Sequence, residues 1–328
     1  MGACHLCFAV GDRAVDGSVK LWNLSRRRAV VDFCPHAVGA GIVRVDADTA
    51  ASSASADQRV FTQGRDGLIK CWRMDRLVSE KQQQQQQQQP ETQLSTGAAH
   101  FCQFALPRWS TAGATSHLLV AACAEQGSLQ LWDLRCSATA VSSISSAKAE
   151  RGMVMCCRLL TPSEHVPACT VVAGYEDGSL EVHDLRASAA VATGERMHSD
   201  PVMACDVARD GRAGVCASAG STLATWALRD AATSAICTTA ASFEVSKSTP
   251  GVGCAELRPD CELFAAGCWD ASVRLYRWRQ PVPLAVLPFH EGSVNSVAFS
   301  PVPGSGVMAA GSKDGRISIW DMYGTAAT

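Results

Sequence analysis

One short motif recurs along the chain and limits its possible folds more than any other feature. Two near copies are Asp16-Gly17-Ser18-Val19-Lys20-Leu21-Trp22 and Asp66-Gly67-Leu68-Ile69-Lys70-Cys71-Trp72. Five further copies, four of them altered, end at Trp132, His183, Trp226, Tyr276 and Trp320. The spacing of about 50 residues predicts a row of similar supersecondary units.

Each copy has the pattern of a β-hairpin. Asp-Gly suits a tight turn, because glycine tolerates a positive φ and aspartate can accept hydrogen bonds from turn amides. Alternation in the strand that follows places Val19 and Leu21 on one face, and Trp22 on the other. Apolar side chains on both faces predict that each sheet packs between two neighbours.

The motif resembles a WD repeat. The period would also fit kelch repeats, but the glycine pairs of kelch are missing. We therefore predict an all-β, seven-bladed WD-repeat β-propeller that forms a single domain over residues 1–328. Its structural repeat positions are Asp16, Trp22, Asp66, Trp72, Trp132, Asp177, Trp226, Asp270, His290, Asp314 and Trp320.

The WD-repeat resemblance implies a buried network of Trp, Ser or Thr, His and the turn Asp. In the last repeat His290, Asp314 and Trp320 match it, but Ala310 stands where the hydroxyl is expected, which predicts an incomplete network. His36 and His198 also fall where structural histidines are expected. Three strands are predicted for this repeat, at 293–299, 306–310 and 316–320.

The ends and one insertion depart from regular repeats. Only 15 residues precede Asp16, enough for one strand, and eight follow Trp320, so the first blade is expected to lack its N-terminal strand or strands. This favours a sequence truncated at its N-terminus. The glutamine-rich segment 80–92 is predicted to be a disordered loop inserted in blade 2.

Composition excludes several classes of function. The formal charge is −2, with 29 Lys and Arg against 31 Asp and Glu. No segment concentrates basic residues into a stripe, so direct binding to nucleic acid is not expected. No apolar run reaches the roughly 18 residues of a membrane span, and no signal peptide is evident. We expect a cytoplasmic or nuclear protein. Its 16 cysteines, such as Cys123, Cys169 and Cys216 in apolar runs, are expected to be reduced core thiols.

The sequence shows no constellation typical of catalysis. Cys4-His5-Leu6-Cys7 has the spacing of a metal-binding pair, but no second pair follows, and alternation within a strand explains it better. Nucleophile elbows, phosphate loops and paired-carboxylate motifs are missing. We predict a protein that is not an enzyme and has no cofactor, metal or small-molecule substrate.

Protein binding is the function that the repeats favour, because loops from all blades converge at one rim. Candidate contact residues beside the Asp-Gly turns are Arg65, Tyr175, Glu176, Trp269 and Lys313. A large aromatic such as Trp269 is a good hot-spot candidate, although it could instead cap its own blade. Leu131-Trp132-Asp133-Leu134-Arg135 also matches a short box that docks cullin-RING ligase adaptors, in which only Arg135 goes beyond an ordinary repeat.

Several segments resemble one family more closely. They include Gly174-Tyr175-Glu176-Asp177-Gly178, Gly267-Cys268-Trp269-Asp270 and Gly311-Ser312-Lys313-Asp314. They are similar to the guanine-nucleotide-binding-protein β-subunit-like protein 1 family, which includes the fungal ASTRA-associated WD-repeat protein. The resemblance is strongest from about Val171 onward.

This resemblance implies a scaffold for protein-complex assembly. Its expected partners are co-chaperones of phosphatidylinositol-3-kinase-related kinases, with links to DNA-damage signalling or chromatin-related complexes. The alternative is a substrate receptor of a cullin-RING ubiquitin ligase. A heterotrimeric G-protein β subunit is rejected, because no heptad run precedes the first strand.

Overall fold

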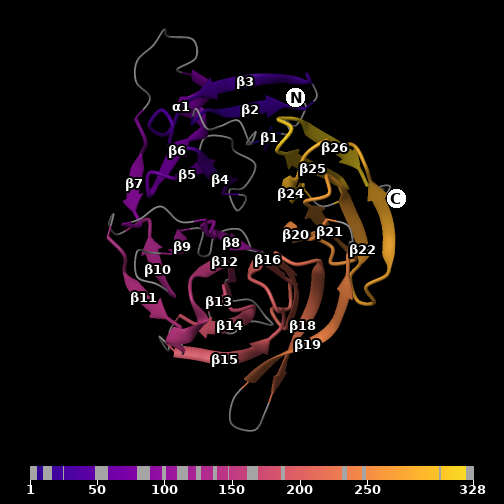
Figure 1. The fold of residues 1–328 in the computed structure, drawn as a ribbon. Helices are drawn as coiled ribbons and strands as arrows, with labels where there is room; N and C mark the ends of the chain where they lie inside the picture. The colour runs from indigo at the N-terminus through magenta and orange to yellow at the C-terminus, as the bar shows by residue number, and fades with distance from the viewer. Residues whose placement is uncertain are drawn as a thin grey trace.

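The computed structural model shows antiparallel β-sheets arranged as a ring (Figure 1). The described residues are 6–9, 17–24, 26–48, 58–79, 89–97, 101–108, 117–122, 127–135, 139–146, 148–160, 169–185, 189–230, 235–245, 249–302 and 304–322. Asp16, Cys4, His5, Cys123 and most of the glutamine tract lie outside them, so the predictions made for these residues are not addressed. No described helix is long and apolar enough to cross a membrane.

The first half of the ring consists of three sheets and a short inner strand. The first sheet contains β1 (Leu6–Ala9), β2 (Val19–Asn23) and β3 (Arg28–Phe33). The second contains β4 (Ile42–Ala47), β5 (Arg59–Gly64), β6 (Leu68–Arg73) and β7 (Thr92–Ser95), with helix α1 (Met74–Ser79) after β6. The inner strand β8 (Pro107–Arg108) comes before the third sheet, β9 (Leu118–Ala122), β10 (Ser128–Asp133) and β11 (Ser142–Ser145).

The second half begins after a 3-10 helix at Ala149–Arg151. One run of strands is β12 (Val154–Leu160), β13 (Thr170–Tyr175), β14 (Ser179–Asp184) and β15 (Ala189–Arg196). The next is β16 (Val202–Val207), β17 (Ala213–Ser218), β18 (Thr222–Asp230) and β19 (Ala235–Glu244). The last two sheets are β20 (Val252–Leu257), β21 (Leu263–Cys268), β22 (Val273–Arg277) and β23 (Pro283–Leu287), then β24 (Val294–Phe299), β25 (Val307–Ser312) and β26 (Ile317–Asp321).

The described strands form six hydrogen-bonded sheets, whereas seven separate blades were expected. The difference comes from one nine-stranded sheet, which contains both runs β12–β15 and β16–β19. Their outer strands β15 and β19 pair in parallel, from Ala192↔Ala235 to Gly194↔Cys237, and β8 joins β12 in parallel. One strand, β1, precedes the first repeat motif, and the three strands expected for the last repeat are confirmed.

The parallel contacts show that neighbouring units have the same orientation. In each four-stranded sheet, the turn between the second and third strands therefore lies at one end of the ring, and the turn between the third and fourth lies at the other. In the three-stranded sheets β1–β3 and β9–β11, the turn between the first two strands corresponds to the former. We call the first end the Asp-Gly face; it carries the turns at Gly17, Gly67, Gly127, Gly178 and Gly315, all with positive φ. The other end is called the opposite face.

Apolar packing between successive sheets holds the ring together. Val19 and Leu21 are buried as the alternation predicts, and they pack with Val60 and Trp72 of the next sheet. Six such apolar clusters occur in the described residues, and each draws its side chains mainly from two successive units. Each unit is therefore stabilised by its neighbours.

The second repeat contains the complete polar network that the WD-repeat pattern implies. His36 Nδ1 lies 2.9 Å from Asp66 Oδ2, and His36 Nε2 lies 3.0 Å from Thr62 Oγ1. Thr62 Oγ1 also accepts a hydrogen bond of 3.0 Å from the indole nitrogen of Trp72. Turn, histidine, hydroxyl and indole thus satisfy one another in the interior.

The last repeat achieves the same network with a hydroxyl on a different strand, so the prediction of an incomplete network is wrong. His290 Nε2 and the indole Nε1 of Trp320 each lie 2.9 Å from Ser318 Oγ, and His290 Nδ1 lies 3.2 Å from Asp314 Oδ2. Ser318 on β26 is paired directly with Ala310 on β25. The hydroxyl therefore comes from β26, two residues before Trp320, and not from the expected position on β25.

The fifth repeat has a sulfur in place of the hydroxyl. His198 Nε2 lies 3.1 Å from Cys216 Sγ, while Nδ1 lies 2.8 Å from Thr222 Oγ1. The indole nitrogen of Trp226 is buried without a hydrogen-bond partner in the described residues. Cys216 is one of several buried free thiols, in line with the expected reduced cysteines, although Cys34 is exposed and Cys169 is half-buried.

Replacing Ser318 with Ala should lower the free energy of unfolding by about 1–3 kcal/mol, because it leaves His290 and Trp320 without their shared partner. Urea denaturation followed by tryptophan fluorescence measures this change. Ser296→Ala, at an exposed position on neighbouring β24, is the matched control and should change stability by less than about 0.5 kcal/mol. Equal effects of the two substitutions would contradict the role of Ser318.

Stability should also fall in mild acid because of His198. Burial lowers the pKa of its imidazole to about 4, although Asp200 opposes the shift. In the unfolded chain His198 has its ordinary pKa near 6.5, so it binds a proton more tightly there than in the folded protein. The stability that neutral His198 contributes is complete above pH 6.5 and is lost as the pH falls toward 4, by about 3 kcal/mol at most. Denaturation midpoints at pH 7.5 and 4.5 should differ less in His198→Asn than in the unmodified chain.

Candidate protein-interaction face

The Asp-Gly face carries an exposed aromatic that sequence analysis missed. Phe101 is 70% exposed, and the guanidinium of Arg65 lies over its ring, 5.8 Å from the centroid. Arg65 itself is exposed, as predicted, and its backbone nitrogen donates to Gly41 O. A cation held over an exposed ring presents both a charged and an apolar contact to a partner.

A buried glutamine fixes the segment that presents Phe101. Gln63, at the end of β5, donates from Nε2 to Cys102 O at 3.0 Å and accepts from Phe104 N at 2.9 Å. Phe104 is completely buried against Phe61. Phe101 therefore directly precedes a segment that Gln63 anchors at Cys102 and Phe104, which limits the entropy lost when a partner binds.

Trp269 packs on its own unit, which is one of the two roles considered for it. It is half-buried, and its ring lies against the start of β20, since a Cβ atom at Gly251 would come within 1.9 Å of Trp269 Cε3. Its backbone nitrogen donates to Gly251 O, and its carbonyl accepts from Ser293 Oγ. The indole thus packs on its own unit while part of its surface faces solvent.

The other candidates on this face divide into exposed and buried residues. Glu176 and Lys313 are exposed, and Glu176 Oε2 accepts a hydrogen bond from Met153 N at 3.2 Å. The prediction that Tyr175 lies at the exposed rim is wrong, because its side chain is only 1% exposed. Alternation along β13 points this residue into the sheet interface, one position before the turn begins.

A buried charge cluster explains the position of Tyr175. Its hydroxyl lies 3.4 Å from His183 Nε2, and its ring lies beneath the guanidinium of Arg151. Glu181, fully buried, lies 2.8 Å from Arg151 Nε and 3.3 Å from His183 Nε2. Burial alone would raise the pKa of Glu181, but His183 and Arg151 outweigh it and lower that pKa. His183 thus replaces the usual tryptophan with an ionic core.

Arg135 lies at the opposite face, away from the other candidates. Its Nε and Nη2 atoms form a fork with the two oxygens of Asp133, at 3.0 and 2.6 Å. This hydrogen-bonded pair holds the pKa of Asp133 at about 2. The side chain is 63% exposed and folds back on the end of its own strand.

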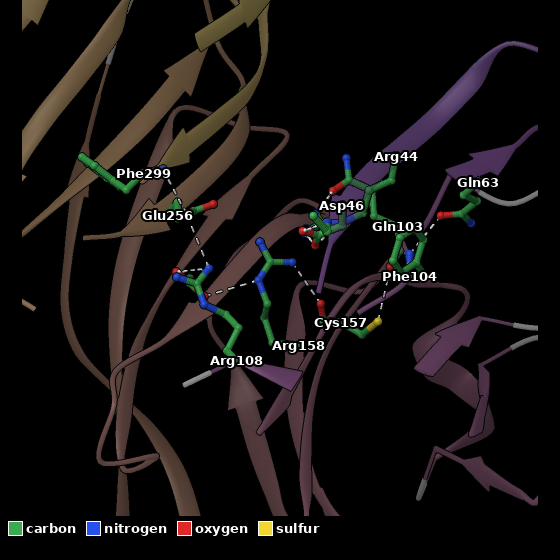
Figure 2. Close-up of polar contacts among 12 residues, drawn as sticks. Arg44, Asp46, Gln63, Gln103, Phe104, Arg108, Cys157, Arg158, Glu256 and Phe299 are labelled. Carbon is green, nitrogen blue, oxygen red and sulfur yellow. Dashed lines mark hydrogen bonds and ion pairs between the residues drawn. The ribbon is translucent and has the colours of Figure 1, made fainter. Parts of the chain in front are cut away.

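The inner strands contain a buried ion network that sequence analysis also missed (Figure 2). Asp206 on β16 lies 3.3 Å from Arg158 of β12 and 3.2 Å from Arg108 of β8. Arg108 also approaches Glu256 of β20 at 3.7 Å. The signal was available in the sequence, because Arg158 and Asp206 interrupt otherwise apolar strands.

Backbone groups complete this network. Asp206 accepts from Leu257 N at 2.8 Å, and Glu256 accepts from Phe299 N at 3.2 Å. Burial raises the pKa of Glu256; Arg108 opposes the shift and Asp206 adds to it. Two cations and two anions thus link five inner strands, from β8 to β24, and hold the ring that presents the Asp-Gly face.

Replacing Asp206 with Asn should reduce the free energy of unfolding by about 3–5 kcal/mol, because the substitution leaves Arg108 and Arg158 with excess buried charge. Asp46→Asn provides a matched control on inner strand β4. The Asp46–Arg44 pair is partly exposed, so its loss should cost about 0–1 kcal/mol. Thermal and urea unfolding of both variants checks this, and a cost for Asp206→Asn no larger than the control would contradict the role of the network.

The described residues hold no group of three or more His, Cys, Asp or Glu side chains arranged for a metal ion. Comparison with known proteins agrees with the fold. The family model "WD domain, G-beta repeat" matches residues 239–277 and 281–321. Together with the ring of sheets, these matches define the chain as a WD-repeat β-propeller of the all-β class.

Within this class, similarity extends over most of the chain. It is 29% identical to mouse guanine nucleotide-binding protein subunit beta-like protein 1, over 94% of this chain and 86% of the relative. It is 28% identical to ASTRA-associated protein 1 of Verticillium alfalfae, over 96% of this chain and 87% of the relative. The Schizosaccharomyces pombe protein of the same name is 45% identical over 67 residues. The resemblance inferred from the sequence is confirmed.

Proposed function

We propose that this protein is a non-catalytic scaffold that holds other proteins within an assembly, in the manner that the name of the ASTRA-associated relatives implies. The observation that carries the proposal is the Asp-Gly face, where Phe101 and Arg65 are exposed together beside backbone that Gln63 holds by hydrogen bonds. Aromatic and arginine side chains of this kind dominate the binding energy of protein interfaces.

The finer proposal concerns the assembly itself. The family resemblance favours co-chaperone complexes that mature phosphatidylinositol-3-kinase-related kinases, in the cytoplasm or the nucleus. A cullin-RING receptor is less favoured, because Arg135 is held by Asp133 and lies on the face opposite Phe101.

We also propose that the propeller is one domain with seven units. Support comes from the nine-stranded sheet, where β12–β15 and β16–β19 each follow the antiparallel order of a four-stranded blade. Counted separately, with β8 assigned to the unit of β9–β11, these runs and the remaining sheets make seven units.

Affinity purification of the full chain from its native cells, with quantitative mass spectrometry, tests the scaffold. Phe101→Ala should reduce the main co-purified proteins about tenfold, since loss of one hot-spot aromatic removes more than about 1 kcal/mol. The melting temperature should stay nearly unchanged, because Phe101 is mostly exposed.

Val286→Ala is the matched control, an exposed apolar residue on strand β23 and not in a turn at either end of the ring. It should leave co-purification unchanged. Equal losses in both variants, or the lack of any reproducible co-purified protein, would overturn the proposal. Ligase adaptors lost only in Arg135→Ala would favour the cullin alternative instead.

A further inference from the structure

The opposite face carries a rim of arginines that follows the repeat. In six of the seven repeats an arginine stands three or four positions after the repeat's aromatic position. These residues are Arg26, Arg76, Arg135, Arg186, Arg229 and Arg279. Arg186 lies outside the described residues. In the other five repeats the third strand ends close to the arginine, so the same end of the ring receives these arginines. Arg135, considered above for a single docking motif, is one member of this series.

The structure shows that four members of this series, Arg26, Arg76, Arg135 and Arg279, are exposed, and it adds others from adjacent turns. We call them the arginine rim: Arg26, Arg27, Arg28, Arg76, Arg135, Arg209, Arg212, Arg277 and Arg279. Exposed acidic residues at the same end of the described chain are fewer: Glu91, Asp260, Glu262 and Asp321. The rim therefore has a positive excess.

This excess is local, since the whole chain has a formal charge of −2. Arg28, Arg76 and Arg279 form no ion pair with any described residue. They come from three separate units, at β3, α1 and the β22–β23 turn. A basic composition does not explain the rim, and the ion pairs among the described residues do not include these three members, although the charge of Arg76 acts on neighbouring Asp75.

The chemistry of the rim fits carboxylates on a protein better than nucleic acid. The planar guanidinium fork binds a carboxylate with two parallel hydrogen bonds. Single-stranded nucleic acid would also need aromatic platforms among the cations. The exposed large apolar residues described at this end are aliphatic, such as Val78, Val141 and Val282, whereas exposed Phe101 and Phe289 belong to the Asp-Gly face.

We propose that the arginine rim is a second protein-interaction surface, which binds an Asp- and Glu-rich segment of a partner. Such a segment follows the turns from one unit to the next, and arginines from successive units contact its carboxylates. The site is independent of whatever occupies the Asp-Gly face. The scaffold then holds two partners at its two ends.

Fluorescence anisotropy with the purified full chain tests this site. The probe is a labelled 12-residue peptide of alternating Asp and Glu, compared with an Asn and Gln peptide of equal length and a 12-nucleotide single-stranded DNA. The chain should bind the acidic peptide more tightly than either control, and added salt should weaken the complex. Tighter binding of the DNA, or no preference for the acidic peptide, would overturn the proposal.

Two triple variants with the same change in net charge locate the binding. Arg28→Gln, Arg76→Gln and Arg279→Gln together should weaken the acidic peptide about tenfold, as expected for several modest exposed charge contacts. The matched set is Lys148→Gln, Arg196→Gln and Arg316→Gln, exposed on the Asp-Gly face, and should change affinity less than about twofold. Equal losses would show a non-specific charge effect and overturn the assignment.

Retaining charge at the rim separates electrostatics from loss of folding. Arg28→Lys, Arg76→Lys and Arg279→Lys together should restore most of the affinity lost in the glutamine set, with a melting temperature close to that of the unmodified chain. Failure of this set to bind better than the glutamine set would contradict an electrostatic contact at the rim. Neither result depends on Phe101, so the test is separate from that of the proposed function.

Discussion

A sheet with two apolar faces must be covered on both, and this single constraint shapes the molecule. Leu21, Val60 and Trp72 lie in one cluster that spans two sheets, and comparable clusters follow along the ring. Each unit thus depends on its neighbours for burial, which is the main source of stability. The six clusters join successive units in series, so every unit between the first and the last is covered on both apolar faces.

Burial of polar groups adds a second requirement, because each must find a partner in the interior. In the second repeat Thr62 supplies the hydroxyl from β5, whereas in the last repeat Ser318 supplies it from β26. In the fourth repeat Glu181 and Arg151 replace the arrangement with an ion pair. The residues that partner the buried polar groups thus differ from unit to unit, and in the fifth repeat the indole nitrogen of Trp226 has no hydrogen-bond partner among the described residues.

This difference explains which features sequence reasoning could reach. The repeat period and strand alternation predicted the fold class, the buried Val19 and Leu21, and the three strands of the last repeat, since these depend on local patterns. The cross-strand hydroxyl of Ser318 and the burial of Tyr175 depend on register and on neighbouring sheets. The exposure of Phe101 depends on Gln63, 38 positions earlier in the chain, which anchors its loop.

The same logic separates stability from recognition. Buried strand side chains pack against the sheets on both faces, so substituting them destabilises the fold. Turn aspartates such as Asp66 and Asp314 bind buried histidines, but exposed turn residues make fewer contacts with the core, and they can differ in chemistry from one end of the ring to the other. The Asp-Gly face presents an aromatic with a cation over it, while the opposite face presents arginines from successive units. A ring of this kind is therefore suited to join two unlike partners through surfaces that its core does not constrain.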